Sequence, residues 1–157
     1  MSALAQAFGR DGIPQLIVDG ALPRFQELMA CLLSDFGKGW DIQVRSQKAT
    51  KAGTVQEAID IMVDSGYGER DIGTYSGGEK KILKSIVRIA FATLQAERTG
   101  KGLKVLVLDE ATDHMDDENA EITIRMLGRL KCFNQVIVIS HHTRVLGEIV
   151  NKIRLGK

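Results

Sequence analysis

The chain has 157 residues, enough for one domain with a buried core. Its formal net charge of +1, from 21 basic and 20 acidic residues, excludes a protein that coats nucleic acid by charge alone. Aromatic residues make up only 5%, which argues against base stacking as a main activity. Cys31 and Cys132 lack zinc-site spacing, and the sequence shows neither a signal peptide nor a long apolar run, so a reduced, cytoplasmic protein is expected.

The first half of the chain is expected to start with a short lead-in, residues 1–13, followed by a helix. Residues 14–36 carry apolar side chains on a broad helical face. Pro23 falls inside this pattern and is expected to split the helix, because proline is best tolerated in a first helical turn. Gly37 and Gly39 are expected to end it.

Two segments then alternate apolar and polar residues, as half-buried strands do. They are residues 40–48 and 58–64, with a polar, basic linker at residues 46–54. A small antiparallel strand pair is expected here. Residues 65–75 contain three glycines and are expected to form a loop.

The second half alternates helices with apolar strands. The run ending at residue 108 is continuously apolar, which is typical of a parallel strand buried on both faces. This order of elements indicates an α/β fold in which helices flank a parallel sheet. Helices are expected at residues 79–97, 117–130 and 143–150, and strands at residues 103–108, 136–139 and 152–155.

Two carboxylates, Asp109 and Glu110, directly follow the first of these apolar runs. Ligands of open α/β sheets bind at the carboxyl ends of the strands. Mg²⁺ usually takes one or two carboxylates together with phosphate oxygens and water, so Asp109 is the candidate metal ligand. Glu110 is the candidate base that orients or deprotonates a water. For the pair alone, a strand that ends in a solvated acidic turn is an equally good interpretation.

A second segment, Ser76, Gly77, Gly78 and Glu79, lies where the helix at residues 79–97 begins. Two glycines let a backbone approach an anion closely, and a helix start offers N–H groups and partial positive charge. Ser76 adds a hydroxyl donor. Taken alone, such a segment is more often an ordinary capped helix start.

A third segment, Ser140 and His141, follows the strand expected at residues 136–139. That strand is expected to lie beside the one that ends at Asp109, which brings His141 to the carboxylate pair. A histidine there can contact a terminal phosphate or the attacking water. A single histidine is more often structural or merely exposed, and the adjacent His142 receives no role.

The order of the three segments, each about thirty residues after the last, resembles the C-terminal half of an ABC ATPase: signature motif, Walker B motif and switch histidine. Residues 111–117 are similar to that family's D-loop, with Asp116 at its aspartate position. Ala111 replaces the frequent proline, and His114 and Met115 replace the usual Asn-Leu pair. The resemblance implies an α/β fold, namely the C-terminal lobe of an ABC-type (P-loop NTPase) ATPase head.

Nearly the whole chain also resembles the SbcC-type ATPases of DNA double-strand-break repair. Residues 7–14 are similar to the point where the coiled coil of those proteins re-enters the head, and the glycine-rich stretch before the signature is similar as well. The resemblance implies one C-terminal lobe over residues 1–157: re-entry from the coil at residues 1–13, a helix and strand pair at 14–75, and the motifs at 76–157.

In that family two heads sandwich two ATP molecules. The resemblance therefore implies that Asp109, Glu110 and His141 serve the ATP and Mg²⁺ of their own head. The signature, residues 76–79, would contact the γ-phosphate of the ATP bound by the second head. Binding of that phosphate would shift an open–closed equilibrium.

Two sets of basic residues gain candidate roles from the resemblance. Lys80 and Arg88 match basic positions that couple the nucleotide state to the rest of the head. Arg45, Lys48 and Lys51 are candidates for contact with DNA phosphates. For both sets, a solvated charged surface is the plainer interpretation.

The 157 residues contain no Gly-x-x-x-x-Gly-Lys-Ser/Thr phosphate loop. This lobe is therefore expected to hydrolyse ATP only when an N-terminal lobe with that loop is supplied. The other partners that the resemblance implies are a second head, an SbcD-type nuclease and double-stranded DNA, with a cytoplasmic or nucleoid-associated location and no membrane.

Several alternatives stay open at this point. The head could belong to a structural-maintenance-of-chromosomes or RecF/RecN-type ATPase, or the chain could be a non-catalytic module that docks on a complete ATPase. A transporter nucleotide-binding domain normally carries its phosphate loop in the same chain. A nuclease metal site would need more carboxylates or histidines to converge on the pair, and only His141, distant in the sequence, is available.

Overall fold

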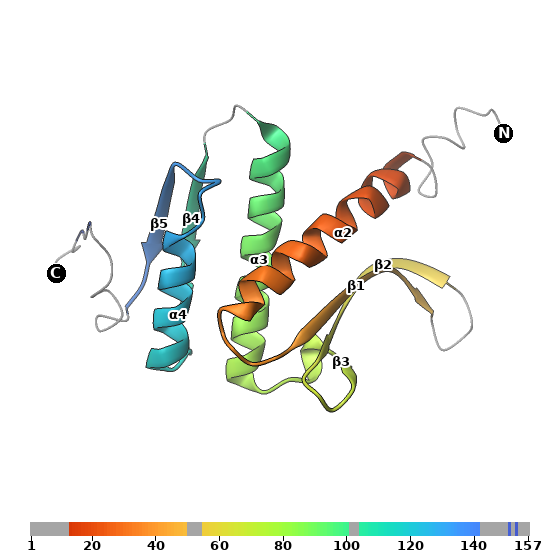
Figure 1. The fold of residues 1–157 in the computed structure, drawn as a ribbon, viewed down its shortest axis with the longest axis horizontal. Helices are drawn as coiled ribbons and strands as arrows, with labels where there is room; N and C mark the ends of the chain where they lie inside the picture. The colour runs from red at the N-terminus through yellow and green to blue at the C-terminus, as the bar shows by residue number, and fades with distance from the viewer. Residues whose placement is uncertain (1–12, 50–54, 101–103, 142–150, 152, 154–157) are drawn as a thin grey trace.

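The computed structural model describes residues 13–49, 55–100, 104–141, 151 and 153 (Figure 1). The lead-in at residues 1–12, the helix predicted at 143–150 and most of the strand predicted at 152–155 lie outside the described residues. The elements are α2 (Ile13–Ser34), β1 (Asp41–Ala49), β2 (Val55–Asp64), β3 (Glu69–Asp71), the short 3-10 helix η1 (Ile72–Thr74), α3 (Gly77–Thr99), β4 (Val105–Asp109), α4 (Asp117–Gly128) and β5 (Gln135–Ile139).

Helix α2 runs through Pro23 without a break, so the predicted split is wrong. Pro23 is exposed, whereas Phe25 and Met29 are buried in the core that α2 shares with α3. This packing outweighs the loss of one backbone hydrogen bond at the proline. The helix ends before Gly37 as predicted, and Gly37 adopts a φ of +60°, a conformation that glycine accepts without a Cβ clash.

Three antiparallel strands, in the order β1-β2-β3, form a sheet beside the two long helices (Figure 1). Ile42 pairs with Val63, and both side chains are buried. The predicted antiparallel pair is confirmed, although the two strands extend into the predicted linker. The loop predicted at residues 65–75 is wrong where β3 lies. All three residues of β3 are exposed, so pairing with β2, rather than an apolar pattern, defines this strand.

Strands β4 and β5 pair in parallel, as predicted, with Leu106 opposite Val136. One face of this sheet packs on the core that contains residues of α3 and α4. Leu106 is buried there, and Leu108 and Val138 pack against the same cluster.

Within the described residues, no element covers the opposite face of the β4–β5 sheet, which is called the uncovered face below. The exposed fractions of Val107, Ile137 and Ile139 are 56%, 39% and 47%. The prediction that β4 is buried on both faces is therefore wrong for this chain. Apolar parallel strands normally have cover on both faces, and the helices that the structure describes cover only one.

Within the described residues, no helix combines the length and the apolar character needed to cross a bilayer.

Candidate functional site

The carboxylate pair lies where β4 ends. Asp109 is the last residue of the strand, Glu110 follows it, and both residues are exposed. Because side chains alternate along a strand, Asp109 lies on the uncovered face with Val107. Glu110 adopts a φ of +53°, which turns the chain sharply away from the sheet. Two exposed carboxylates at such a strand end suit a hard cation such as Mg²⁺, which prefers oxygen ligands.

The end of β5 lies beside the carboxylate pair. Asp109 is in register with Ile139, and the backbone N–H of Glu110 donates to the Ile139 carbonyl oxygen over 2.9 Å. His141, two residues further on, is exposed. The prediction that these two strands are neighbours is confirmed, and His141 is thereby placed at the same sheet edge as both carboxylates.

The signature segment, residues 76–79, begins α3. Ser76 is the N-cap, and its backbone N–H and its hydroxyl donate to a Glu79 carboxylate oxygen over 3.1 and 2.6 Å. These bonds, the hydroxyl's first, hold the pKa of Glu79 below its ordinary value. The Ser76 hydroxyl is thus engaged within its own helix start, which also satisfies the plain capping interpretation.

The two glycines of the signature segment are not explained by capping. Gly77 and Gly78 are exposed, and neither is among the glycines with positive φ. A Cβ atom built at either position would meet no atom within 4 Å. The fold of this chain therefore tolerates a side chain at both positions.

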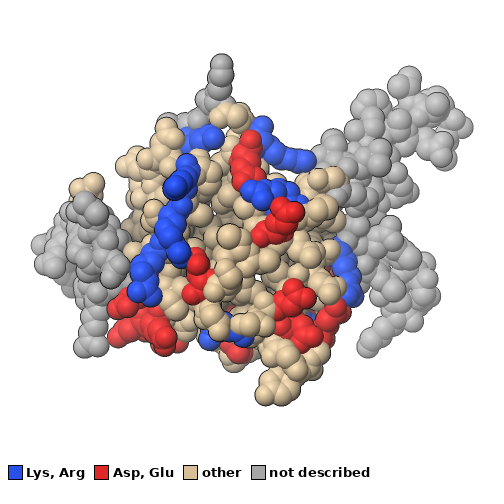
Figure 2. All heavy atoms as spheres, in the orientation of Figure 1, with Lys and Arg blue, Asp and Glu red and all other residues tan. Residues whose placement is uncertain are grey.

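Strands β4 and β5 both run in the direction of the end of α3 at which the signature segment lies. Figure 1 shows α3 starting at the lower edge of the view, toward which β4 and β5 both run. On the face seen in Figure 2, basic side chains form one narrow run on the left of the view, and elsewhere basic and acidic side chains are interspersed. Among the described residues, no three His, Cys, Asp or Glu side chains gather as metal ligands, so the nuclease-metal alternative gains no support.

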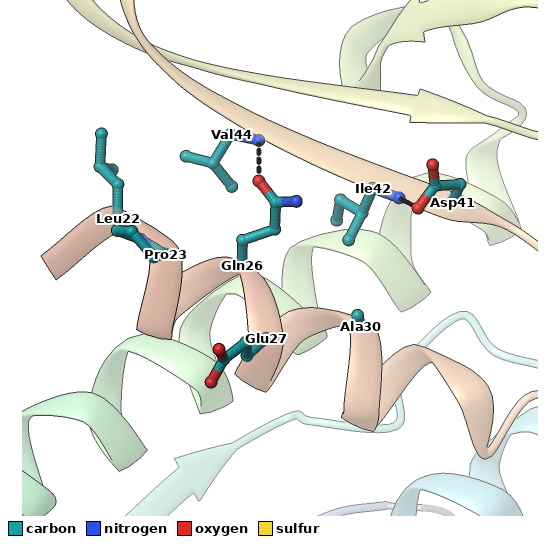
Figure 3. A pocket seen from close by; sticks show the side chains of 8 residues that line it. All are labelled: Leu22, Pro23, Gln26, Glu27, Ala30, Asp41, Ile42 and Val44. Atoms are coloured by element: carbon teal, nitrogen blue, oxygen red, sulfur yellow. Dashed lines mark hydrogen bonds between the residues drawn. The ribbon is translucent and has the colours of Figure 1, made fainter. Parts of the chain in front are cut away.

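A groove lies elsewhere, between α2 and β1 (Figure 3). None of the motif residues lines it. The Gln26 side chain reaches across the groove and accepts a 3.1 Å hydrogen bond from the backbone N–H of Val44. This hydrogen bond gives a partner to one backbone N–H on the open edge of β1. The packing of α2 on that edge therefore accounts for the groove.

Comparison with known families tests the family resemblance. The family described as SbcC/RAD50-like, Walker B motif, matches residues 46–129, which is more than half of the chain. The chain belongs to the SbcC/RAD50-like family.

Two relatives of this SbcC/RAD50-like chain carry the same printed description, DNA double-strand break repair Rad50 ATPase. The one from Nanoarchaeum equitans is 24% identical over 90% of this chain and 17% of its own length. The one from Methanocaldococcus jannaschii is 24% identical over 98% of this chain and 14% of its own length. The chain thus spans only about a sixth to a seventh of the length of these relatives.

Solved structures show the same fold. A structure from a study of ATP-driven dimerization of SMC ATPases superposes with a TM-score of 0.65 at 16% identity, covering 90% of this chain and 84% of that one. An Smc head domain derived from Pyrococcus furiosus, bound to the C-terminal domain of ScpA, gives a TM-score of 0.53 at 20% identity over 78% of this chain and 28% of that one. The SbcC/RAD50-like chain therefore has the fold of an SMC-type ATPase head.

In this SbcC/RAD50-like chain, the residue at the predicted D-loop aspartate position caps a helix. Asp116 is the N-cap of α4 and accepts hydrogen bonds from the backbone N–H and side-chain amide of Asn119, over 2.8 and 2.6 Å. These bonds, the backbone one first, hold the pKa of Asp116 below its ordinary value. Met115, which replaces the usual leucine, is buried in the core, so this replacement keeps an apolar anchor.

The residues predicted to couple the nucleotide state or to contact DNA differ in their exposure and in their bonding partners. Lys80 is half-buried and Arg88 is exposed on α3. The Arg45 guanidinium bonds to Glu69 at 2.7 Å, which reduces its capacity to contact phosphate. The side chains of Lys48 and Lys51 lie outside the described part of the chain, so their predicted role stays a prediction.

Two residues of structural importance were not singled out from the sequence. Tyr75 is buried directly before the signature segment, and Thr112 is buried in the D-loop with its hydroxyl 2.8 Å from that of Ser140. The hydroxyl of Tyr75 needs a partner because the side chain is buried, but the sequence does not report that burial. For Thr112 no local pattern marks the contact, since its partner is 28 residues away.

Proposed function

We propose that this chain is the C-terminal lobe of an ATPase head that binds and hydrolyses ATP when it is combined with a lobe carrying the phosphate loop. The observation that carries the proposal is the meeting of the Asp109–Glu110 pair with the His141 segment at one edge of the parallel sheet. Membership of the SbcC/RAD50-like family supports it, as the matched region is described by its Walker B motif.

In this proposal, each of three residues has its own chemical role. The Asp109 carboxylate holds Mg²⁺, which when bound neutralises negative charge on the phosphates. The Glu110 carboxylate orients the attacking water and accepts its proton. The His141 imidazole donates a hydrogen bond to the terminal phosphate or the water. All three residues are exposed, so a nucleotide held by a second lobe can reach them.

The signature segment acts on a different nucleotide, the one bound by a second head. Support comes from Gly77 and Gly78, whose missing side chains leave open space at the exposed start of α3. The free N–H groups and partial positive charge of a helix start favour a phosphate there. Ser76 and Glu79 complete the contact, with the Ser76 hydroxyl exchanging its bond to Glu79 for one to the γ-phosphate. Lys80 and Arg88 on the same helix transmit the nucleotide state.

The uncovered face of the β4–β5 sheet supports the need for a partner lobe. Val107, Ile137 and Ile139 expose apolar surface that parallel strands normally bury. An N-terminal lobe that carries the phosphate loop would cover this face and place ATP at the carboxyl ends of β4 and β5.

The relatives described as DNA double-strand break repair ATPases support a biological setting in DNA repair. We include in the proposal an SbcD-type nuclease as partner, double-stranded DNA as the molecule acted on, and a cytoplasmic or nucleoid-associated location. Head closure driven by ATP would then control access of the nuclease to DNA ends.

The direct test is reconstitution of the head from this chain and the phosphate-loop lobe of the same protein. ATP hydrolysis should appear only in the combined sample, and Ser76→Arg should abolish ATP-dependent association of two heads by placing bulk and charge against the γ-phosphate. Strong turnover by the 157-residue chain alone, or normal association of the Ser76→Arg head, would refute the corresponding part of the proposal.

A further inference from the structure

The turn after β4 is fastened to the end of β5 by two hydrogen bonds. One joins backbone atoms, from the Glu110 N–H to the Ile139 carbonyl oxygen over 2.9 Å. The other joins side chains, between the hydroxyls of Thr112 and Ser140 over 2.8 Å. Glu110 and Thr112 therefore both contact the segment that leads into His141.

The same turn contains two residues in the left-handed region. Glu110 has a φ of +53° and His114 a φ of +61°, and neither is a glycine. Such conformations cost conformational energy and persist only where the surroundings fix them. Thr112 lies midway between them with an exposed fraction of 0%. The backbone N–H groups of Asp113 and Met115 close the turn by donating to the carbonyl oxygens of Glu110 and Thr112, each over 3.2 Å.

We propose that Thr112 is a positioning residue for the ATPase reaction. Its hydroxyl pair with Ser140 holds the Glu110 turn and the His141 segment in one fixed relation, so that both groups meet the same nucleotide. This inference rests on the proposed function, and it adds a residue that touches neither ATP nor Mg²⁺.

The hydroxyl, rather than the volume of Thr112, carries this role. A hydroxyl that is fully buried needs a partner, and Ser140 supplies it. Valine at position 112 would keep the branched shape and remove the bond, whereas serine would keep the bond and remove only a methyl group. Ser140 is half-buried, so Ser140→Ala breaks the same bond from a less constrained position.

The first measurement is amide hydrogen exchange by NMR in the 157-residue chain, which needs neither ATP nor a partner. Thr112→Val and Ser140→Ala should each speed exchange of the Glu110 amide by about fivefold, the equivalent of one net hydrogen bond. Thr112→Ser should leave that exchange close to wild type. Unchanged exchange of the Glu110 amide in both hydroxyl-deleting variants would overturn the proposal.

The second measurement is turnover in the reconstituted head. Thr112→Val and Ser140→Ala should lower kcat by about tenfold with little change in KM for ATP, because misplaced groups slow the chemistry without removing binding contacts. The double variant should be no slower than either single variant, and the Thr112→Ser head should turn over ATP at close to the wild-type rate.

If amide exchange rises while kcat stays at wild type, and Glu110→Gln is slow in the same head, the positioning role is refuted and the proposed function is not. If Glu110→Gln is also fully active, the proposed function itself fails.

Discussion

The hydroxyl of Tyr75 donates a 2.7 Å hydrogen bond to the carbonyl oxygen of Val63. Tyr75 directly precedes the signature segment, and Val63 lies in β2, so this bond fastens the start of α3 to the antiparallel sheet. The Tyr75 ring also lies 5.6 Å from that of Trp40 and 4.8 Å from the Arg70 guanidinium. These contacts of Tyr75 therefore hold the adjacent Ser76 in a fixed position relative to the antiparallel sheet.

Replacement of Tyr75 by phenylalanine should destabilise the chain by about 1–2 kcal/mol, because a buried hydrogen bond to the Val63 carbonyl oxygen is lost. Chemical denaturation of the 157-residue chain would measure this change in the free energy of unfolding. Tyr67→Phe is the matched control, since Tyr67 is 89% exposed and should tolerate loss of its hydroxyl. Equal effects of the two substitutions would contradict an anchoring role for Tyr75.

Glu110→Gln should slow ATP hydrolysis by the reconstituted head by roughly 10²–10⁴ while leaving ATP binding intact. The amide keeps the shape of the side chain but cannot accept the proton of the attacking water. Steady-state turnover and equilibrium binding of a fluorescent ATP analogue would separate the two effects. Glu121→Gln, on the exposed side of α4, is the control and should retain activity. Wild-type turnover of the Glu110→Gln head would remove Glu110 from the role of base.

Gly78→Ala should separate the folding of this chain from its association with a second head. The added Cβ meets no atom within 4 Å, so the melting temperature of the isolated chain should stay level or rise, since alanine is a better helix former than glycine. ATP-dependent association of heads should weaken, because the methyl group keeps the backbone away from the opposing phosphate.

Gly128→Ala provides the comparison for this test. Gly128 is also helical and open to a Cβ, but it lies at the other end of α4 from the motifs. Analytical ultracentrifugation with and without ATP would report the association of both variants. Association of Gly78→Ala heads at the wild-type level would show that the signature glycines face no close neighbour.

Glu79→Gln should remove a stabilising charge whose effect depends on pH. The pKa of Glu79 lies below its ordinary value in the folded chain, chiefly because of the Ser76 hydroxyl, so ionisation of Glu79 favours folding. This contribution is complete above the unfolded-state pKa and disappears as pH falls through the lower folded-state pKa. The difference in unfolding free energy between wild type and variant should therefore be constant at neutral pH and shrink below about pH 4.5. A difference that does not change down to pH 3 would rule out this linkage.

Much of the candidate site was predictable because its signals are local. The apolar run before Asp109 and the run before Ser140 each define a strand from consecutive residues, and parallel pairing then brings their ends together. The start of α3 at Gly77 follows from the capping residues Ser76 and Glu79, which bond to each other within one helical turn. Helix α4 likewise begins after Asp116, whose carboxylate accepts from the residue three positions later.

Other features follow from packing between distant segments, which a local pattern does not report. Pro23 was expected to break a helix, but burial of its neighbours against α3 keeps the helix continuous. The β3 strand has no apolar residue to mark it and forms by pairing with β2. Val107 belongs to a run that predicts burial on both faces, yet no element of the described chain covers it.

The sequence by itself therefore determined the order of the motifs, the helices and strands that present them, and the family to which they belong, because periodicity and capping act over a few residues. Only the tertiary structure decided how the motifs are supported. The Tyr75 bond to Val63 and the Thr112 bond to Ser140 join residues 12 and 28 positions apart, and such contacts exist only after packing has brought their elements together. The uncovered face of β4 and β5 is a tertiary property for the same reason, since burial depends on which neighbour is present.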